Sequence, residues 1–112
     1  ALIYRLLDGS DGFYRGRARL VILEADSAAG QKGNADHFEQ AAKELSQALS
    51  AERNPEVGEA YALRGRAHAG RAAALKAEGS DPRDALAKAE ADFRTAVEKK
   101  YPLVEQDNPR RR

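Results

Sequence analysis

The chain contains no cysteine, methionine or tryptophan among its 112 residues, and only four prolines. Without cysteine it can form neither disulfides nor thiolate metal sites. Aromatic residues make up 6% of the sequence and β-branched residues are sparse, which disfavours β-strands. Ala, Leu and Arg are frequent instead, and they are good helix formers. The composition therefore predicts an all-α protein.

Long hydrophobic runs and a strong net charge are also missing. No apolar stretch approaches the roughly 20 residues that a membrane-spanning helix needs. The net charge of +1 argues against a general electrostatic nucleic-acid binder. Charged residues form 33% of the chain with both signs interspersed, so we expect one well-solvated domain that interacts with neither nucleic acid nor membrane. The compartment stays open, with the cytoplasm favoured.

Turn-forming residues separate a short apolar segment from four helical segments. The apolar segment, 1–7, is helix-compatible and is expected to cap the domain. Asn54 and Asp81 are expected N-caps, each followed by a first-turn proline, and 103–112 is a polar tail ending in three arginines. The turn signals and apolar periodicity predict helices over about 11–29, 35–52, 55–77 and 82–100.

An internal repeat is the strongest pattern in the sequence. Residues 14–19 (YRGRAR) return 49 residues later as 63–68 (LRGRAH), and 45–49 return 48 residues later as 93–97. Two matches at nearly one period indicate a duplicated helical unit. We expect one domain over 1–102, with units at about 10–54 and 55–102. Because the chain begins at Ala1 and not at Met, we interpret it as a piece of a longer polypeptide.

Small residues recur in register with this repeat. Gly16 and Gly65 lie inside predicted helices, where Gly costs about 1 kcal/mol relative to Ala. A close approach of the two helices within each unit would explain both glycines. Arg15 and Arg64 directly precede the glycines, and acids stand at matching places on the second helices. We therefore expect two ion pairs within the units, Arg15 with Glu44 and Arg64 with Asp92, each worth about 1 kcal/mol or less if exposed.

Paired helices with this order of motifs resemble the tetratricopeptide repeat. The matching positions are Tyr61, Gly65, Ala89, Phe93, Ala96 and Pro102 in the second unit, and Gly16, Ala41, Leu45, Ala48 and Pro55 in the first. The units are longer than the family's period of about 34 residues, which predicts elongated helices. The resemblance implies antiparallel helical hairpins, as a fragment of a right-handed α-solenoid. A four-helix arrangement is the alternative.

The resemblance also implies a binding surface. Arg17 and Arg66 directly follow the glycines, on the side that lines the concave groove of tetratricopeptide proteins. The other residues expected there are Phe13, Tyr14, Leu20 and Val21, with Ala62, Leu63 and Ala69. Such a surface suits a peptide or partner helix with an acidic group, so reversing either charge should weaken binding and leave the fold intact. Alternatively, both arginines are solvated or covered by 1–7.

Signals for catalysis are weak. His37 and His68 lie on different predicted helices and lack metal-ligand spacing, so neither a metal nor another cofactor is expected. We expect His68 to pack in place of a family aromatic and His37 to lie on the surface. A non-enzymatic protein–protein interaction module is the favoured function. A self-associating four-helix scaffold and a non-catalytic accessory domain of a larger enzyme remain alternatives.

Overall fold

A computed structural model describes residues 10–28, 35–50, 57–99 and 101. Within these ranges all the regular secondary structure is helical and there is no strand, which confirms the all-α part of the predicted fold class. The helices are α1 (Ser10–Ala28), α2 (Ala35–Ser50), α3 (Val57–Ala77) and α4 (Arg83–Glu98). The expected segment 1–7, the cap at Asn54 and the tail 103–112 lie outside the described residues.

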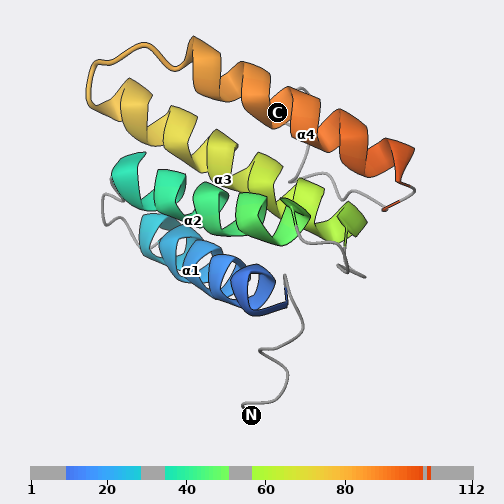
Figure 1. Ribbon diagram of the computed structural model, residues 1–112. Coiled ribbons are helices and arrows are strands. Elements are labelled where there is room, and N and C mark those ends of the chain that lie inside the picture. Colours follow the sequence, from blue (N-terminus) through green and yellow to red (C-terminus); the bar gives the residue numbers. More distant parts are fainter. Residues whose placement is uncertain (1–9, 29–34, 51–56, 100, 102–112) are drawn as a thin grey trace.

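The four helices lie side by side in chain order (Figure 1). Each helix packs against the next, and α1 also touches α3. Within the described residues, α1 and α4 make no extended contact, so they form the two edges of an open layer of helices. In a closed four-helix bundle, the first and last helices would pack against each other.

Alanine and a few large apolar side chains form the core between these helices. Phe13, Leu20 and Leu45 are its largest fully buried side chains. The cluster also contains Leu23, Phe38, Ala41, Ala42, Ala48, Ala60, Leu63 and Ala67. Because the side chain of alanine is only a methyl group, the helix backbones approach closely, and little space remains between facing residues.

Three glycines occupy the closest helix contacts. A Cβ at Gly16 would lie 2.8 Å from Cγ of Leu45, and one at Gly65 would lie 2.7 Å from Cε1 of Phe93. Both predicted close approaches are therefore confirmed. A Cβ at Gly70 would overlap the ring of Phe38. This contact joins α3 to α2, between the two units. The repeat did not reveal it, because the residue of the first unit that corresponds to Gly70 is Val21 and not a glycine.

The turn between α3 and α4 is well defined. Gly79 has a φ of +83°, and the amide of Ser80 donates to the carbonyl of Leu75 at 2.8 Å, as in a Schellman ending of α3. Pro82, not Asp81, is the N-cap of α4, which corrects the prediction by one residue. Oδ1 of Asp81 nevertheless accepts a hydrogen bond from the backbone amide of Arg83 at 3.0 Å. An N-cap side chain likewise accepts from a backbone amide in the first turn of its helix.

Candidate interaction surface

The side of α1 that faces away from the other helices is apolar. Tyr14, Val21 and Ile22 are 54%, 52% and 60% exposed, and Ala18 and Ala25 are exposed between them. We call these five residues the outer α1 face. Their spacing of three, four and seven residues places them on one side of a helix. Residues of this size are usually buried, so a contiguous exposed set marks a candidate interaction site.

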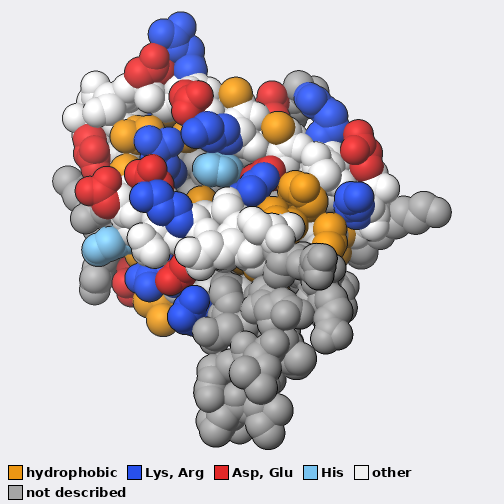
Figure 2. Space-filling model, in the orientation of Figure 1, with side chains coloured by type: hydrophobic (Ala, Val, Ile, Leu, Met, Phe, Trp, Pro, Cys, Tyr) orange, Lys and Arg blue, Asp and Glu red, His pale blue; other side chains and the backbone are white. Residues whose placement is uncertain are grey.

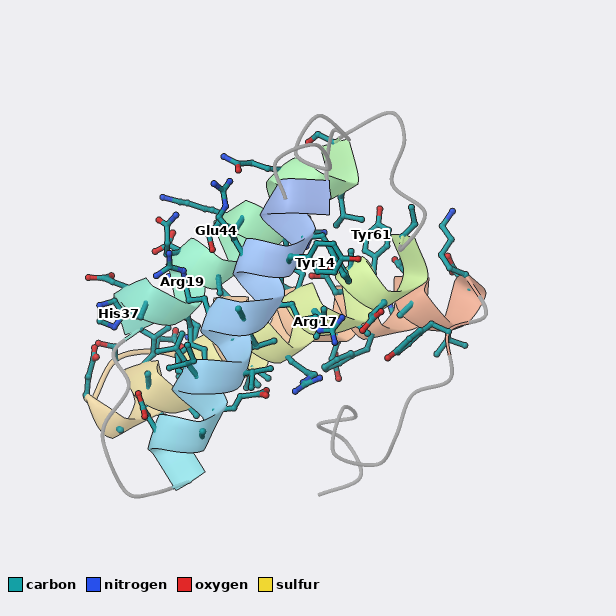
Figure 3. The ribbon with its side chains drawn as sticks, turned by 90° about the horizontal axis from the view of Figure 1, so that it is seen from below. Tyr14, Arg17, Arg19, His37, Glu44 and Tyr61 are labelled. Carbon is teal, nitrogen blue, oxygen red and sulfur yellow. The ribbon has the colours of Figure 1, made fainter. Side chains whose placement is uncertain are left out.

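Arg17 lies beside this face. Its side chain is exposed and makes no hydrogen bond or ion pair within the described part of the chain. In Figure 3, Tyr14 and Arg17 lie on one side of α1, and Arg19 lies on the opposite side, toward Glu44 of α2. A guanidinium beside an aromatic ring and aliphatic groups can bind an acidic group on an apolar partner.

Four other residues predicted for the binding surface are buried, so the expectation that they lie on an open face is wrong. Their exposed fractions are 1% for Phe13, 0% for Leu20, 2% for Ala62 and 3% for Leu63. Because α1 contacts α3, side chains that lie between these helices pack in the core and are not exposed. Phe13 lies against the exposed ring of Tyr14, with the ring centroids 5.2 Å apart and the planes at 75°. It supports the outer α1 face from beneath.

Arg66 forms an ion pair that joins α3 to α1. Its Nε donates to Oε2 of Glu24 at 3.1 Å, and its Nη2 bonds the other carboxylate oxygen. Both side chains are partly buried. Reversing the charge of Arg66 would therefore place two carboxylates together in a helix contact, contrary to the expectation that the fold would be undisturbed. Charge reversal of Arg17 remains a suitable test of binding, whereas charge reversal of Arg66 would also disturb the fold.

The predicted ion pair of the second unit is confirmed. Nε and Nη2 of Arg64 donate to the two carboxylate oxygens of Asp92 at 2.8 and 2.7 Å. Nη1 donates to Oγ of Ser46 at 3.0 Å, so one guanidinium links α2, α3 and α4. The hydrogen bonds to Asp92 raise the pKa of Arg64. The guanidinium carbon also lies 5.4 Å from the ring centroid of Tyr61.

In the first unit, Glu44 pairs with a different arginine from the one predicted. Nε and Nη2 of Arg19 donate to its carboxylate oxygens at 2.9 and 3.1 Å, whereas the sequence predicted Arg15. Arg19 lies one turn further along α1. The repeat contained a signal for this pair, because Arg19 corresponds to His68, whose Nε2 lies 3.7 Å from Oδ2 of Asp92. Both units thus place a nitrogen base from this position beside the acid.

His68 packs between α3 and α4, as predicted. Its side chain is 14% exposed, and its buried Nδ1 has no hydrogen-bond partner among the described residues. Burial lowers the pKa of His68, and Asp92 opposes this effect. His37 is exposed on α2, also as predicted (Figure 3).

Neither a metal site nor a membrane-spanning helix is found in the described residues. They contain no group of three or more His, Asp or Glu side chains that could hold a metal ion. None of their helices is both long and apolar enough to cross a membrane. Basic and acidic side chains are interspersed over the face of the molecule in Figure 2. Comparisons with protein-family models, curated proteins and solved structures found no match to this chain.

Proposed function

We propose that this chain is a protein–protein interaction module that binds a partner helix on the outer α1 face. Its role in this proposal is to hold a helix-sized apolar surface on a rigid scaffold, without catalysis. The observation that carries the proposal is the repeat itself. It allows each position of α1 to be compared with a position of α3 whose packing is known.

The outer α1 face corresponds to the packed face of α3. Positions 14, 18, 21 and 25 correspond, 49 residues later, to Leu63, Ala67, Gly70 and Ala74. Leu63, Ala67 and Ala74 are buried, and Gly70 lies against the Phe38 ring of α2. In the second unit, this face receives a neighbouring helix. The same face of the first unit is exposed, so its chemistry and curvature suit a helix as the partner.

The hairpin architecture also supports the proposal. Gly contacts within each unit, bidentate Arg–acid pairs and an open order of helices are compatible with a tetratricopeptide-like module of two elongated units. Such units bury their apolar faces against neighbours. Arg17 adds a preference for a partner helix that carries an acidic side chain next to its apolar stripe.

Two synthetic helical peptides of the length of α1 test this function. Both carry the same Leu/Ala stripe, flanked by Glu in one peptide and by Lys in the other. We expect the Glu-flanked peptide to bind more tightly and to shift the amide resonances of α1 around Tyr14, Arg17 and Val21. Arg17→Glu should reverse the preference between the peptides, because it changes the sign of the charge beside the apolar face.

Matched variants separate this surface from the rest of the molecule. Val21→Glu places a charge in the middle of the outer α1 face and should abolish peptide binding. Ala87→Glu, at an exposed position of α4, should leave binding unchanged. If neither peptide binds, or if the resonance shifts are confined to α4, the proposed function is contradicted.

A further inference from the structure

We propose that the partner helix is α1 of a second copy of this chain, packed antiparallel on the outer α1 face to form a two-fold symmetric dimer. This inference rests on the proposed function, because it names the occupant of the same surface. A two-fold interface must be complementary to itself. The outer α1 face satisfies this condition in both shape and charge.

Large and small residues alternate so that the face fits an inverted copy of itself. The residue numbers of Tyr14 and Ala25 add up to 39, and so do those of Ala18 and Val21. An antiparallel pair centred between residues 19 and 20 therefore places Tyr14 opposite Ala25 of the second copy, and Ala18 opposite Val21. Tyr14 and Val21 thus each face a methyl group, which is how closely packed helix pairs interlock.

The charges beside the face change sign along the helix. Arg15 and Arg17 precede the centre, and Glu24 and Asp26 follow it. At 100° per residue, Arg15 and Asp26 lie on one flank of the face, and Arg17 and Glu24 lie on the other. In a two-fold antiparallel pair, each flank of one helix lies beside the same flank of the other helix, which runs in the opposite direction. The arginines of one copy therefore lie beside the acids of the other on both flanks. Parallel pairing would set like charges against each other.

Three of these charged residues can each form a further ion pair. Arg17 and Asp26 make no hydrogen bond or ion pair within the described ranges. Glu24 bonds Arg66, but its side chain is 35% exposed and a carboxylate can accept from a second guanidinium. At Arg17, Asp26 and Glu24 the dimer would therefore add ion pairs without breaking those seen within the described part of the monomer.

The opposite edge of the molecule fits the outer α1 face less well. With the 48-residue offset, Leu86 and Val97 of α4 correspond to Phe38 and Leu49 of α2, and both are exposed. However, Glu90 stands where α2 buries Ala42. Arg94 replaces Ser46, which accepts a hydrogen bond from Arg64. Head-to-tail association would pack α4 of one copy on α1 of the next, as α2 packs on α3. Because Arg64 corresponds to Arg15, this packing would place Arg94 against Arg15, and we reject this mode of association.

The dimer should be weak and concentration-dependent. One helix of 19 residues is about 28 Å long, and pairing it with one other helix buries less than the roughly 1,600 Å² of a standard stable interface. Sedimentation equilibrium of the full chain, from micromolar to near-millimolar concentration, should show reversible monomer–dimer exchange. Val21→Glu should weaken association by at least about tenfold, and Ala87→Glu should not change it.

Charge exchange tests the antiparallel register. Arg15→Asp alone and Asp26→Arg alone each place like charges across one flank, so each variant should dimerise more weakly than the native chain. Mixing the two variants restores opposite charges at both contacts, so the mixture should form a heterodimer. A fold defect in one variant could not produce this recovery, because mixing leaves the sequence of each chain unchanged.

Cysteine crosslinking gives a second, independent measurement, since the chain has no native cysteine. Ala18→Cys lies near the two-fold axis and should crosslink to its own copy with a short bis-maleimide. Two copies of Ala25→Cys would be separated by about 16 Å along the helices and should not react with each other. Ala25→Cys mixed with Tyr14→Cys should crosslink readily.

Several results would overturn the inference. A chain that stays monomeric near millimolar concentration has no second copy on this face, and its own segment 1–7 or another protein then remains as occupant. Loss of the dimer in Leu86→Glu but not in Val21→Glu assigns the contact to α4. Self-crosslinking of Ala25→Cys assigns parallel pairing. A monomer that still binds the Glu-flanked peptide overturns the dimer alone, whereas loss of peptide binding as well contradicts the proposed function.

Discussion

Gly70 determines how closely α3 approaches α2, because a methyl group at this position would overlap the Phe38 ring. Cδ1, Cε1 and Cζ of the ring occupy the space that a side chain at position 70 would need. Gly16 and Gly65 play the same part within the units, against Leu45 and Phe93. At the residue scale, the fold therefore depends on three positions at which a side chain is missing.

Gly70→Ala should destabilise the protein by up to about 2 kcal/mol. The gain in helix propensity is up to about 1 kcal/mol, and the cost of forcing the Phe38 ring out of its position is about 1–3 kcal/mol. Urea denaturation measures the difference. Phe38→Leu in the Gly70→Ala background should recover part of the loss. If Gly70→Ala alone is more stable than the native chain, the tight contact is not what limits this position.

His68 makes the stability depend on pH. Burial lowers its pKa below 6.5, Arg64, Lys88 and Arg71 lower it further, and Asp92 raises it. The folded state therefore disfavours the proton more than the unfolded state does. The contribution of His68 is fully present above the unfolded pKa and is lost as the pH falls toward the folded pKa.

We expect the free energy of unfolding to fall as the pH decreases below the unfolded pKa of 6.5 toward the lower folded pKa, and His68→Gln to flatten this dependence. Urea titrations at several pH values measure it. His37→Gln, on the exposed surface of α2, is the matched control and should retain the native pH profile. An unchanged profile in His68→Gln would assign the pH dependence to other groups.

At the scale of the helices, ion pairs join elements that share few large apolar contacts. Arg64 links α2, α3 and α4 through Ser46 and Asp92. The pair between Arg66 and Glu24 links α3 to α1 across the boundary between the units. These bidentate bonds fix the rotation of each helix about its axis, which determines which of its residues reach the surface.

Arg66→Glu should destabilise the protein by about 1 kcal/mol, because it opposes Glu24 with a like charge in a partly buried contact. The double variant Arg66→Glu with Glu24→Arg restores opposite charges and should recover most of the loss. Thermal and urea denaturation of the four proteins of this cycle give the coupling energy. A double variant no more stable than Arg66→Glu alone would show that the pair contributes nothing to the α1–α3 contact.

At the scale of the whole molecule, the open order of helices gives two protected elements and two edges. α2 and α3 have a helix on either side, whereas α1 and α4 each lie at an edge of the layer (Figure 1). In such arrays, stability is close to a sum of contacts between neighbours. The two edge helices should therefore open first.

Native-state hydrogen exchange of a dilute sample should show the slowest amides in α2 and α3. The Val21→Glu variant is the control, because exchange in α1 then reports the monomer alone. At high concentration of the native chain, the amides of α1 should slow further, since the proposed dimer covers this edge. Equal protection of α1 and α3 in the dilute Val21→Glu variant would contradict an open array.

The sequence by itself determined the helices, the glycine contacts inside each unit and the ion pair of the second unit. Turn residues and helical periodicity are local signals, so the helix ranges agree with the structure to within a few residues. Gly16, Gly65 and the pair of Arg64 with Asp92 were predictable because the repeat marks both partners in register. The segments that precede and follow these helices lie outside the described residues, so their predicted roles stay predictions.

Only the tertiary structure decided how the two units meet. The burial of Phe13 and Leu63, the pair of Arg66 with Glu24, and the contact of Gly70 with Phe38 all lie between α3 and the first unit. A repeat pattern compares equivalent positions and contains no information on the distance or rotation between units. Because one residue turns a helix by 100°, a small rotation moves a side chain from the surface into the core. The outer α1 face could be recognised only after the equivalent face of α3 was seen to be packed.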